Sequence, residues 1–182
     1  TADAIRDAVS QLPAGSSVRA VAVTGMGMDG VPIDEHGQWL YPFISWHDPR
    51  TVPQMQWWLE NIGAERQFSI GGNPVWPINS ALRIRWVAQH EPAIYERTRK
   101  WLLIEDFLNF MLTGRCVTDY SMASCTMLFD QRTLNWSDEL LGLSDIPRDL
   151  LCEALPSGTV IGQVHDQAAA RTSLGLPAEG HV

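Results

Sequence analysis

Apolar residues recur along this chain with the spacing of helices in some segments and of strands in others. Residues 51–62 carry large apolar side chains at i, i+3 and i+4, and Gly63 follows as a C-terminal stop. A second helix is predicted to begin at Asn79 or Ser80 and to end before Pro92. By the same criteria, further helices are expected over residues 1–12, 106–112 with Asp106 as N-cap, 137–143, 148–154 and 166–174.

Short apolar runs predict strands over residues 18–24, 101–104 and 160–164. Between the first two, residues 31–46 form two apolar segments around the polar turn 34–37, which ends in glycine. This pattern predicts a hairpin rather than a helix. Strands mixed with helices indicate an α/β domain.

The glycine-rich stretch GMGMDG, Gly25 to Gly30, follows the predicted strand 18–24 and has the spacing G-x-G-x-x-G. A dinucleotide site needs a helix that opens directly behind the glycines, so that the pyrophosphate meets its N-terminus. Here Pro32 and the hairpin pattern occupy that place, which argues against a dinucleotide. Two alternatives stay open: a turn without a ligand, or a loop whose bare backbone lies against a small polar ligand.

Composition narrows the function further. The 182 residues are 45% hydrophobic with a formal net charge of -8, which suits a globular protein and leaves no basic stripe for nucleic acid. No apolar run approaches the ~20 residues of a membrane span, and no signal peptide opens the sequence, so we expect a cytoplasmic protein without a membrane partner. The spacing of cysteines and histidines predicts no metal site.

Trp76 stands apart from the other tryptophans. It lies in GGNPVWPINS, an irregular segment with two prolines, whereas most tryptophans fall in periodic apolar patterns. An aromatic ring in such a segment can stack on the apolar face of a sugar, or it can plug the top of the core. The sequence supports both interpretations equally.

Several motifs together resemble the FGGY family of carbohydrate kinases. The segment VTDYSMASCTMLFDQRTLNWSDELLGLSDIPRDLLCEALPSGTVIGQV resembles the family's D-x-S-x-A-S, T-x-L-x-D, Trp and S-G-x-x-I-G-x-V run. PINSALRIRWVAQHEP is similar to the family's signature helix, with Arg83 where lysine is usual. The match to the long run is carried by Asp119, Ser121, Ala123, Ser124, Trp136, Leu140, Leu141, Gly158 and Gly162.

This resemblance implies an α/β fold, part of an actin-like ATPase (ribonuclease H-like) domain with a mixed sheet, hairpin and flanking helices. Residues 1–182 would form part of the N-terminal, sugar-binding domain. The phosphate-binding strand and hairpin are then expected before Thr1, the general-base aspartate beyond Val182, and the ATP-binding domain further on. No residue of this chain is expected to be catalytic, and the chain alone is expected to be inactive.

The activity implied is transfer of the γ-phosphoryl of ATP, with Mg²⁺, to a hydroxyl of a small-molecule sugar. GMGMDG and the following hairpin are closest to fuculose- and rhamnulose-type kinases, and a ketose of the fuculose, rhamnulose or xylulose kind is favoured. The alternative is a non-catalytic sugar-binding or regulatory module of the same fold, for which the expected aspartate would be replaced. The oligomeric state is left open, a homodimer included.

The same resemblance implies the substrate-binding residues. Family members place the residues at Gly27 and Met28 beside the sugar, where glycerol kinases carry an Arg-Glu pair and xylulose kinases a Met-His pair. Asp29 either accepts hydrogen bonds from sugar hydroxyls or fixes the turn. Asn79 matches an asparagine of fuculose-type kinases, and with Trp76 it completes the expected site.

Overall fold

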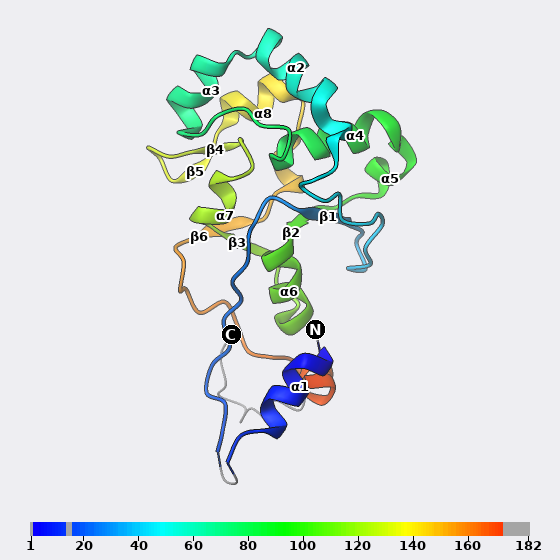
Figure 1. Cartoon of the computed structure of the whole chain (residues 1–182), viewed down its shortest axis with the longest axis vertical. Helices are drawn as coiled ribbons and strands as arrows, with labels where there is room; N and C mark the ends of the chain where they lie inside the picture. Colours follow the sequence, from blue (N-terminus) through cyan, green and yellow to red (C-terminus); the bar gives the residue numbers. More distant parts are fainter. Residues whose placement is uncertain (1, 14–15, 173–182) are drawn as a thin grey trace.

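The computed structural model describes residues 2–13 and 16–172. Figure 1 shows an elongated molecule with most of the helices and the hairpin at residues 129–136 at one end, the other strands in the middle, and the first and last helices at the other end. The helices are α1 Ala2–Ser10, α2 Val52–Asn61, α3 Ala64–Gly71, α4 Ser80–His90, α5 Pro92–Arg97, α6 Ile104–Thr113, α7 Tyr120–Ser124, α8 Asp138–Ser144 and α9 Asp166–Thr172, with 3₁₀ turns η1 Pro49–Thr51 and η2 Arg148–Leu150.

The strands form three short pairs. β1 Gly30–Ile33 runs antiparallel to β2 Lys100–Leu103. β3 Val117–Asp119 runs parallel to β6 Glu153–Leu155. β4 Phe129–Asp130 and β5 Asn135–Trp136 form an antiparallel hairpin.

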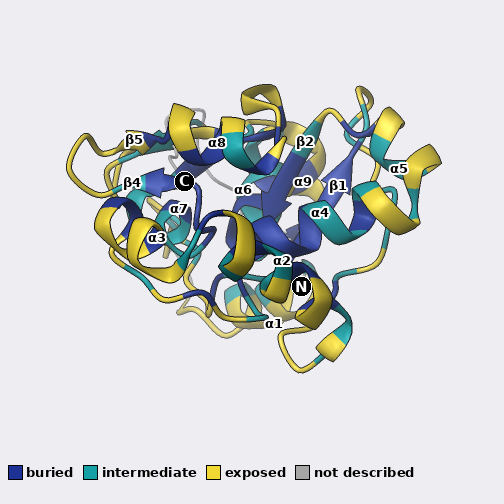
Figure 2. Cartoon of the chain, turned by 90° about the horizontal axis from the view of Figure 1, so that it is seen from above, coloured by how far each residue is buried: buried dark blue, intermediate teal, exposed yellow. Residues whose placement is uncertain are grey.

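The main core lies between α4 and the elements around it. Ala81, Leu82, Ile84 and Val87 of α4 are all buried, so this helix is enclosed on most of its circumference. Figure 2 shows the buried residues concentrated on α4, β1 and β2 in the middle of the molecule. The glycine loop is the segment that leads into β1.

The hairpin prediction is confirmed in part: β1 begins at Gly30 and no helix opens there, but the predicted second arm forms no strand. The turn closes through a hydrogen bond from Asp34 N to Gln38 O, and the second arm returns through one bridge, between Ile33 and Trp39. Most of the pairing of β1 is instead with β2, seventy residues further along the chain. The predicted helices over 51–62, from 80 and over 137–143, and the strand at 101–104, are also confirmed.

The strand predicted over residues 18–24 is not formed among the described residues, where this segment carries only a β-bridge at Ala20. This segment is extended in Figure 1, but within the described residues it forms no strand ladder, and its side chains are exposed or half-buried. A strand needs hydrogen-bonding neighbours as well as an apolar sequence, and an apolar run does not reveal whether they are present.

Three further predictions need correction. Asp106 is not the N-cap of its helix: α6 begins at Ile104, and the Asp106 carboxylate, one turn in, accepts a hydrogen bond from Leu103 N at 3.2 Å. Residues 148–154 form the short turn η2 and then β6 rather than a helix. Residues 160–164 form no strand, and the last two residues of the helix predicted to end at 174 lie outside the described residues.

Candidate functional site

The glycine loop turns sharply in the left-handed region of backbone space. Gly27 and Met28 both have φ of 68°, and Asp29 N donates a hydrogen bond to Gly27 O at 2.8 Å. This i+2 to i bond makes Met28 the centre of a γ-turn. A left-handed backbone at a methionine is unfavourable, so surrounding contacts must hold the loop in this shape.

The N-terminal half of α4 supplies those contacts from one side. Ser80 Oγ and Arg83 Nη1 each donate to Met28 O at 2.8 Å, and Arg83 Nη1 also donates to Ile78 O. Arg83 Nη2 lies 3.0 Å from Asp29 Oδ1, and the arginine is only 1% exposed. A single buried guanidinium therefore ties the loop to the start of α4.

Asp29 helps to fix the turn, because its carboxylate pairs with Arg83. Burial raises the pKa of Asp29, whereas the charge of Arg83 lowers it, and the negative charge of Glu105 raises it. The side chain keeps part of its surface exposed, at 20%. Both roles foreseen for Asp29, fixing the turn and meeting a hydroxyl, are thus compatible with its position.

A second carboxylate supports the loop from the opposite side. Glu105, in the first turn of α6, accepts a hydrogen bond from Gly27 N at 2.8 Å through Oε1. A Cβ added to Gly25 would lie 2.2 Å from that same oxygen. Glycine at position 25 is therefore required for the carboxylate to reach the loop in this geometry.

Trp76 and Asn79 lie just before α4, next to the contacts that fix the loop. Trp76 is 53% exposed, so it does not plug the core; Val75, its neighbour, is buried instead. Asn79 is buried, accepts from Trp76 N at 2.8 Å and donates to Cys125 O at 3.0 Å. Its amide thus fixes the main chain on which Trp76 is presented.

The structure therefore brings the five sequence-predicted residues to one region, the start of α4 and the loop tied to it. Sequence reasoning missed Glu105 altogether and assigned Asp106 only a capping role. The available signal was two consecutive carboxylates directly after a buried strand, a place where charged side chains are unexpected without a partner.

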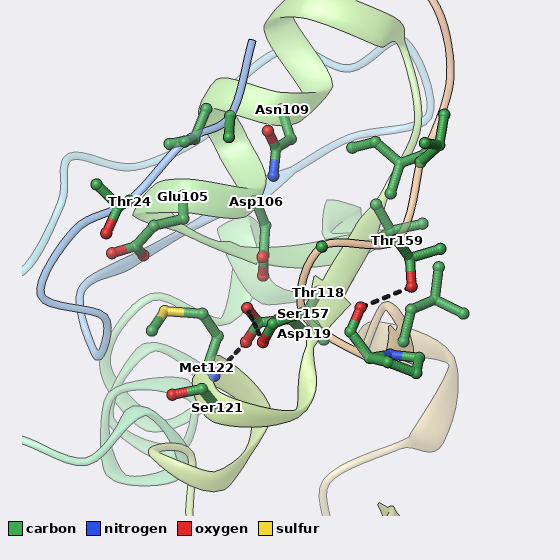
Figure 3. A pocket seen from close by; sticks show the side chains of 18 of the residues that line it. Thr24, Glu105, Asp106, Asn109, Thr118, Asp119, Ser121, Met122, Ser157 and Thr159 are labelled. Atoms are coloured by element: carbon green, nitrogen blue, oxygen red, sulfur yellow. Dashed lines mark hydrogen bonds between the residues drawn. The ribbon is translucent and has the colours of Figure 1, made fainter. Parts of the chain in front are cut away.

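A pocket of about 470 Å³ opens behind the loop, between residues 20–25, α6, β3, α7 and residues 155–161. Figure 3 shows the carboxylates of Glu105, Asp106 and Asp119 among its lining side chains. Asp119 accepts from Met122 N and from Ser157 Oγ, both at 2.8 Å. No lysine, arginine or histidine is among the described residues that line this pocket, so it favours neutral or cationic groups over anions.

Asp106 is expected to make the stability of the protein depend on pH. Burial raises the pKa of its carboxyl to about 8, against about 3.9 in an unfolded chain. The folded protein then keeps a proton that the unfolded chain releases, so the free energy of unfolding should fall as pH rises from about 4 to about 8, by up to about 1.4 kcal/mol per pH unit. Denaturant unfolding of the full-length protein between pH 5 and 8 measures this slope.

Asp106→Asn should reduce that slope, because the asparagine stays neutral and keeps an oxygen for Leu103 N. Asp138→Asn, at a carboxylate 89% exposed, serves as the control and should leave the slope unchanged. Equal slopes for the wild type and Asp106→Asn would contradict the proton assigned to Asp106.

Neither a metal-binding cluster nor a membrane-spanning helix is present among the described residues. Residues 2–13 and 16–172 contain no group of three His, Cys, Asp or Glu side chains arranged to hold a metal ion, so we assign no Mg²⁺ ligand to them. Over the same residues, every helix is too short or too polar to cross a bilayer.

Comparisons with known proteins show the family and the fold. The sequence model for the FGGY family of carbohydrate kinases, N-terminal domain, matches residues 1–179. The chain is 36% identical over 160 residues to L-fuculokinase from Escherichia coli (strain K12), covering 88% of this chain and 34% of that one. It is 34% identical over 164 residues to glycerol kinase from Thermococcus kodakarensis, covering 87% of this chain and 33% of that one.

Among solved structures, xylulose kinase from Rhodospirillum rubrum superposes with a TM-score of 0.90 at 27% identity, over 98% of this chain and 36% of that chain. The expected α/β class and the actin-like ATPase fold are confirmed. The chain spans about a third of the length of the curated relatives that it matches.

Proposed function

This chain belongs to the FGGY family of carbohydrate kinases, and on that premise we propose that it is the sugar-binding part of an ATP-dependent sugar kinase. The whole enzyme transfers the γ-phosphoryl of ATP to a hydroxyl of the sugar. This chain forms part of the N-terminal domain, and its contribution is to bind and orient the hydroxyl-bearing substrate. Such positioning is a large share of catalysis in phosphoryl transfer.

The observation that carries the proposal is the glycine loop fixed between two helices. Arg83 of α4 and Glu105 of α6 hold it in an otherwise unfavourable turn, with β1 rather than a helix behind it. A backbone held this way in advance loses little entropy when a small ligand binds. Without a helix N-terminus behind the glycines, the loop lacks the feature that binds a pyrophosphate.

For the sugar, we propose a ketose of the fuculose, rhamnulose or xylulose kind, phosphorylated at a primary hydroxyl. The relative with the higher identity of the two described is an L-fuculokinase, although a glycerol kinase follows closely. Gly27 and Met28 stand where glycerol kinases of the family carry a charged pair. Neither residue is charged, so the loop cannot hold glycerol as such a pair would, and the space beside Gly27 is filled by Met122, whose Sδ would lie 3.1 Å from an added Cβ.

The site residues take distinct roles in this proposal. The backbone of Gly27 lies against the sugar, Met28 offers an apolar contact, and Asp29 accepts from a hydroxyl with its exposed edge. Trp76, half-exposed, stacks on an apolar face of the ring. Asn79 acts through the main chain of Trp76, which its amide holds.

The phosphoryl-transfer step itself is not assigned to the described residues. When bound, MgATP supplies the phosphoryl group and the charge that stabilises its transfer. The described residues hold no metal-binding cluster, and the general base is expected beyond Val182. We therefore propose that the isolated 182-residue chain shows no turnover.

A substrate panel tests this function. The full-length protein, with ATP and Mg²⁺, is mixed with L-fuculose-, L-rhamnulose- and xylulose-type ketoses and with glycerol, and ADP release is measured. We expect one ketose to give kcat/KM at least tenfold above glycerol, and the isolated chain to give none. Preference for glycerol would overturn the sugar class, and binding of a ketose without any ADP release would favour the non-catalytic module.

A further inference from the structure

Glu105 is a buried carboxylate, and among the described residues only one of its two oxygens accepts a hydrogen bond. The residue is 5% exposed and lies in the first turn of α6, where the helix dipole favours a negative charge. Its Oε1 accepts from Gly27 N at 2.8 Å. Its Oε2 is buried and, among the described residues, has no hydrogen-bond partner.

An unpartnered buried carboxylate oxygen is unfavourable, because it has lost water without gaining another donor. In the view of Figure 3 the carboxylate points toward Thr24, away from Asp106, and Glu105, Thr24 and Met122 all line the pocket of about 470 Å³. A ligand in this pocket can supply the donor that Oε2 lacks when the Glu105 side chain turns that oxygen, which is covered in the structure, toward the pocket.

The chemistry of the pocket restricts that ligand. The lining contains the carboxylates of Glu105 and Asp119, the Asp106 carboxyl, whose pKa burial raises to about 8, and, within the described residues, no basic side chain. An anionic group would be repelled, whereas a neutral hydroxyl can donate to the free oxygen. The volume falls in the range of small-molecule sites, and a polyhydroxylated molecule fits both requirements.

The glycine at position 25 of the loop leaves space for the Glu105 carboxylate. A Cβ at Gly25 would meet Oε1 at 2.2 Å, and Gly25, unlike Gly27, does not have a positive φ. The contact with Glu105, rather than backbone strain, is therefore what a side chain at position 25 would disturb. Glu105 reaches the loop because position 25 has no side chain.

We propose that Glu105 is a sugar-binding residue, whose Oε2 accepts a hydrogen bond from a hydroxyl of the phosphoryl-accepting sugar while Oε1 holds Gly27 N. This inference rests on the proposed sugar-kinase function and extends it. It adds to the site a specificity-determining carboxylate that comes from α6, not from the glycine loop or the segment before α4.

Glu105→Gln in the full-length enzyme tests the inference with little change of shape. The glutamine oxygen can still accept from Gly27 N, while its NH₂ group takes the place of Oε2 and is a donor instead of an acceptor. The sugar KM should rise about tenfold to a hundredfold, the range for losing a hydrogen bond to a charged group, with the ATP KM within about twofold. Glu139→Gln, at an exposed carboxylate paired with Arg66, is the matched control and should change neither.

Deoxy analogues of the sugar identify the contact. For the wild type, one analogue that lacks a single hydroxyl should show a raised KM, and the same analogue should bring no further loss in Glu105→Gln. If every analogue and the variant have additive effects, no hydroxyl meets Glu105 and the inference is wrong.

Gly25→Ala gives a second route that leaves the carboxylate in place. It should raise the sugar KM in the wild type by displacing Oε1, but have little effect in a Glu105→Ala background. An active wild type whose sugar KM changes less than twofold in both Glu105→Gln and Gly25→Ala overturns the role of Glu105 alone. A wild type without ADP release on any sugar overturns the proposed function itself.

Discussion

Replacing Gly27 by leucine in the full-length enzyme should raise the KM for the sugar by on the order of a hundredfold, while the KM for ATP changes less than threefold. Gly27 has φ of 68°, so any other residue is strained there by about 1 to 2 kcal/mol. A Cβ would also lie 3.1 Å from Met122 Sδ. Both effects push the loop out of the position in which we propose that it meets the sugar.

Steady-state kinetics with each substrate varied in turn measures the effect. Gly114→Leu is the control, because Gly114 has a similar φ of 73° but nothing within 4 Å of its added Cβ. It should lower stability without changing the sugar KM. Equal increases of the two KM values in Gly27→Leu would mean that the loop does not contact the sugar selectively.

The elements that the sequence predicted well are those whose local signals agree with their burial. The helix that starts at Ser80 has apolar residues at helical spacing and a boundary at Glu91-Pro92, and it occupies the centre of the core. Gly114 ends α6 with φ of 73°, as a C-terminal glycine does. In both cases sequence-local chemistry and tertiary packing lead to the same structure.

The failures arise where structure depends on distant partners. Residues 18–24 form an apolar run like that of a buried strand, yet no described strand pairs with them. α5, Pro92–Arg97, begins at the proline that was used to end the preceding helix, because proline is also favoured in a first helical turn. A periodicity argument cannot distinguish these cases, since it contains no information on neighbours.

In the candidate site, too, features with a local sequence signal were found and features that depend on distant partners were missed. The loop that contains Gly27 to Asp29 stood out because its glycine spacing is local, and Trp76 because it interrupts a pattern, whereas the contact of the loop with a sugar was implied by the family resemblance. Glu105 is 78 residues away from the amide that it binds, and nothing near it in sequence reveals that contact. The role of Arg83 was hidden for a related reason: a basic residue on a helix is normally solvated, and only the fold buries it.

The buried position of Arg83 leads to the second large expected effect: Arg83→Met should destabilise the full-length protein by about 3 to 5 kcal/mol. The substitution leaves the carbonyls of Met28 and Ile78 without this donor and Asp29 without its buried cation. In a domain of this size the midpoint of thermal unfolding should fall by about 10 °C. Arg132→Met, at a side chain 71% exposed, should shift it by less than about 2 °C.

Lysine at position 83 should recover part of the loss, because it restores the charge and one of the donors but not the two-pronged geometry. A loss as large in Arg83→Lys as in Arg83→Met would mean that the shape of the guanidinium, not its charge, decides stability.

The pH dependence of the Arg83→Met defect separates the ion pair from the carbonyl contacts. The charge of Arg83 lowers the pKa of Asp29, so without it burial and Glu105 should raise that pKa further. The variant then favours a protonated Asp29, and its deficit relative to wild type should grow as pH rises from about 5 to 8. Asp29→Asn in the Arg83→Met background removes the unpaired charge, so it should restore part of the stability at pH 8 and little at pH 5. A stability deficit that is constant across this pH range would assign the effect of Arg83 to its hydrogen bonds with the carbonyls of Met28 and Ile78. The ion pair with Asp29 would then contribute nothing to it.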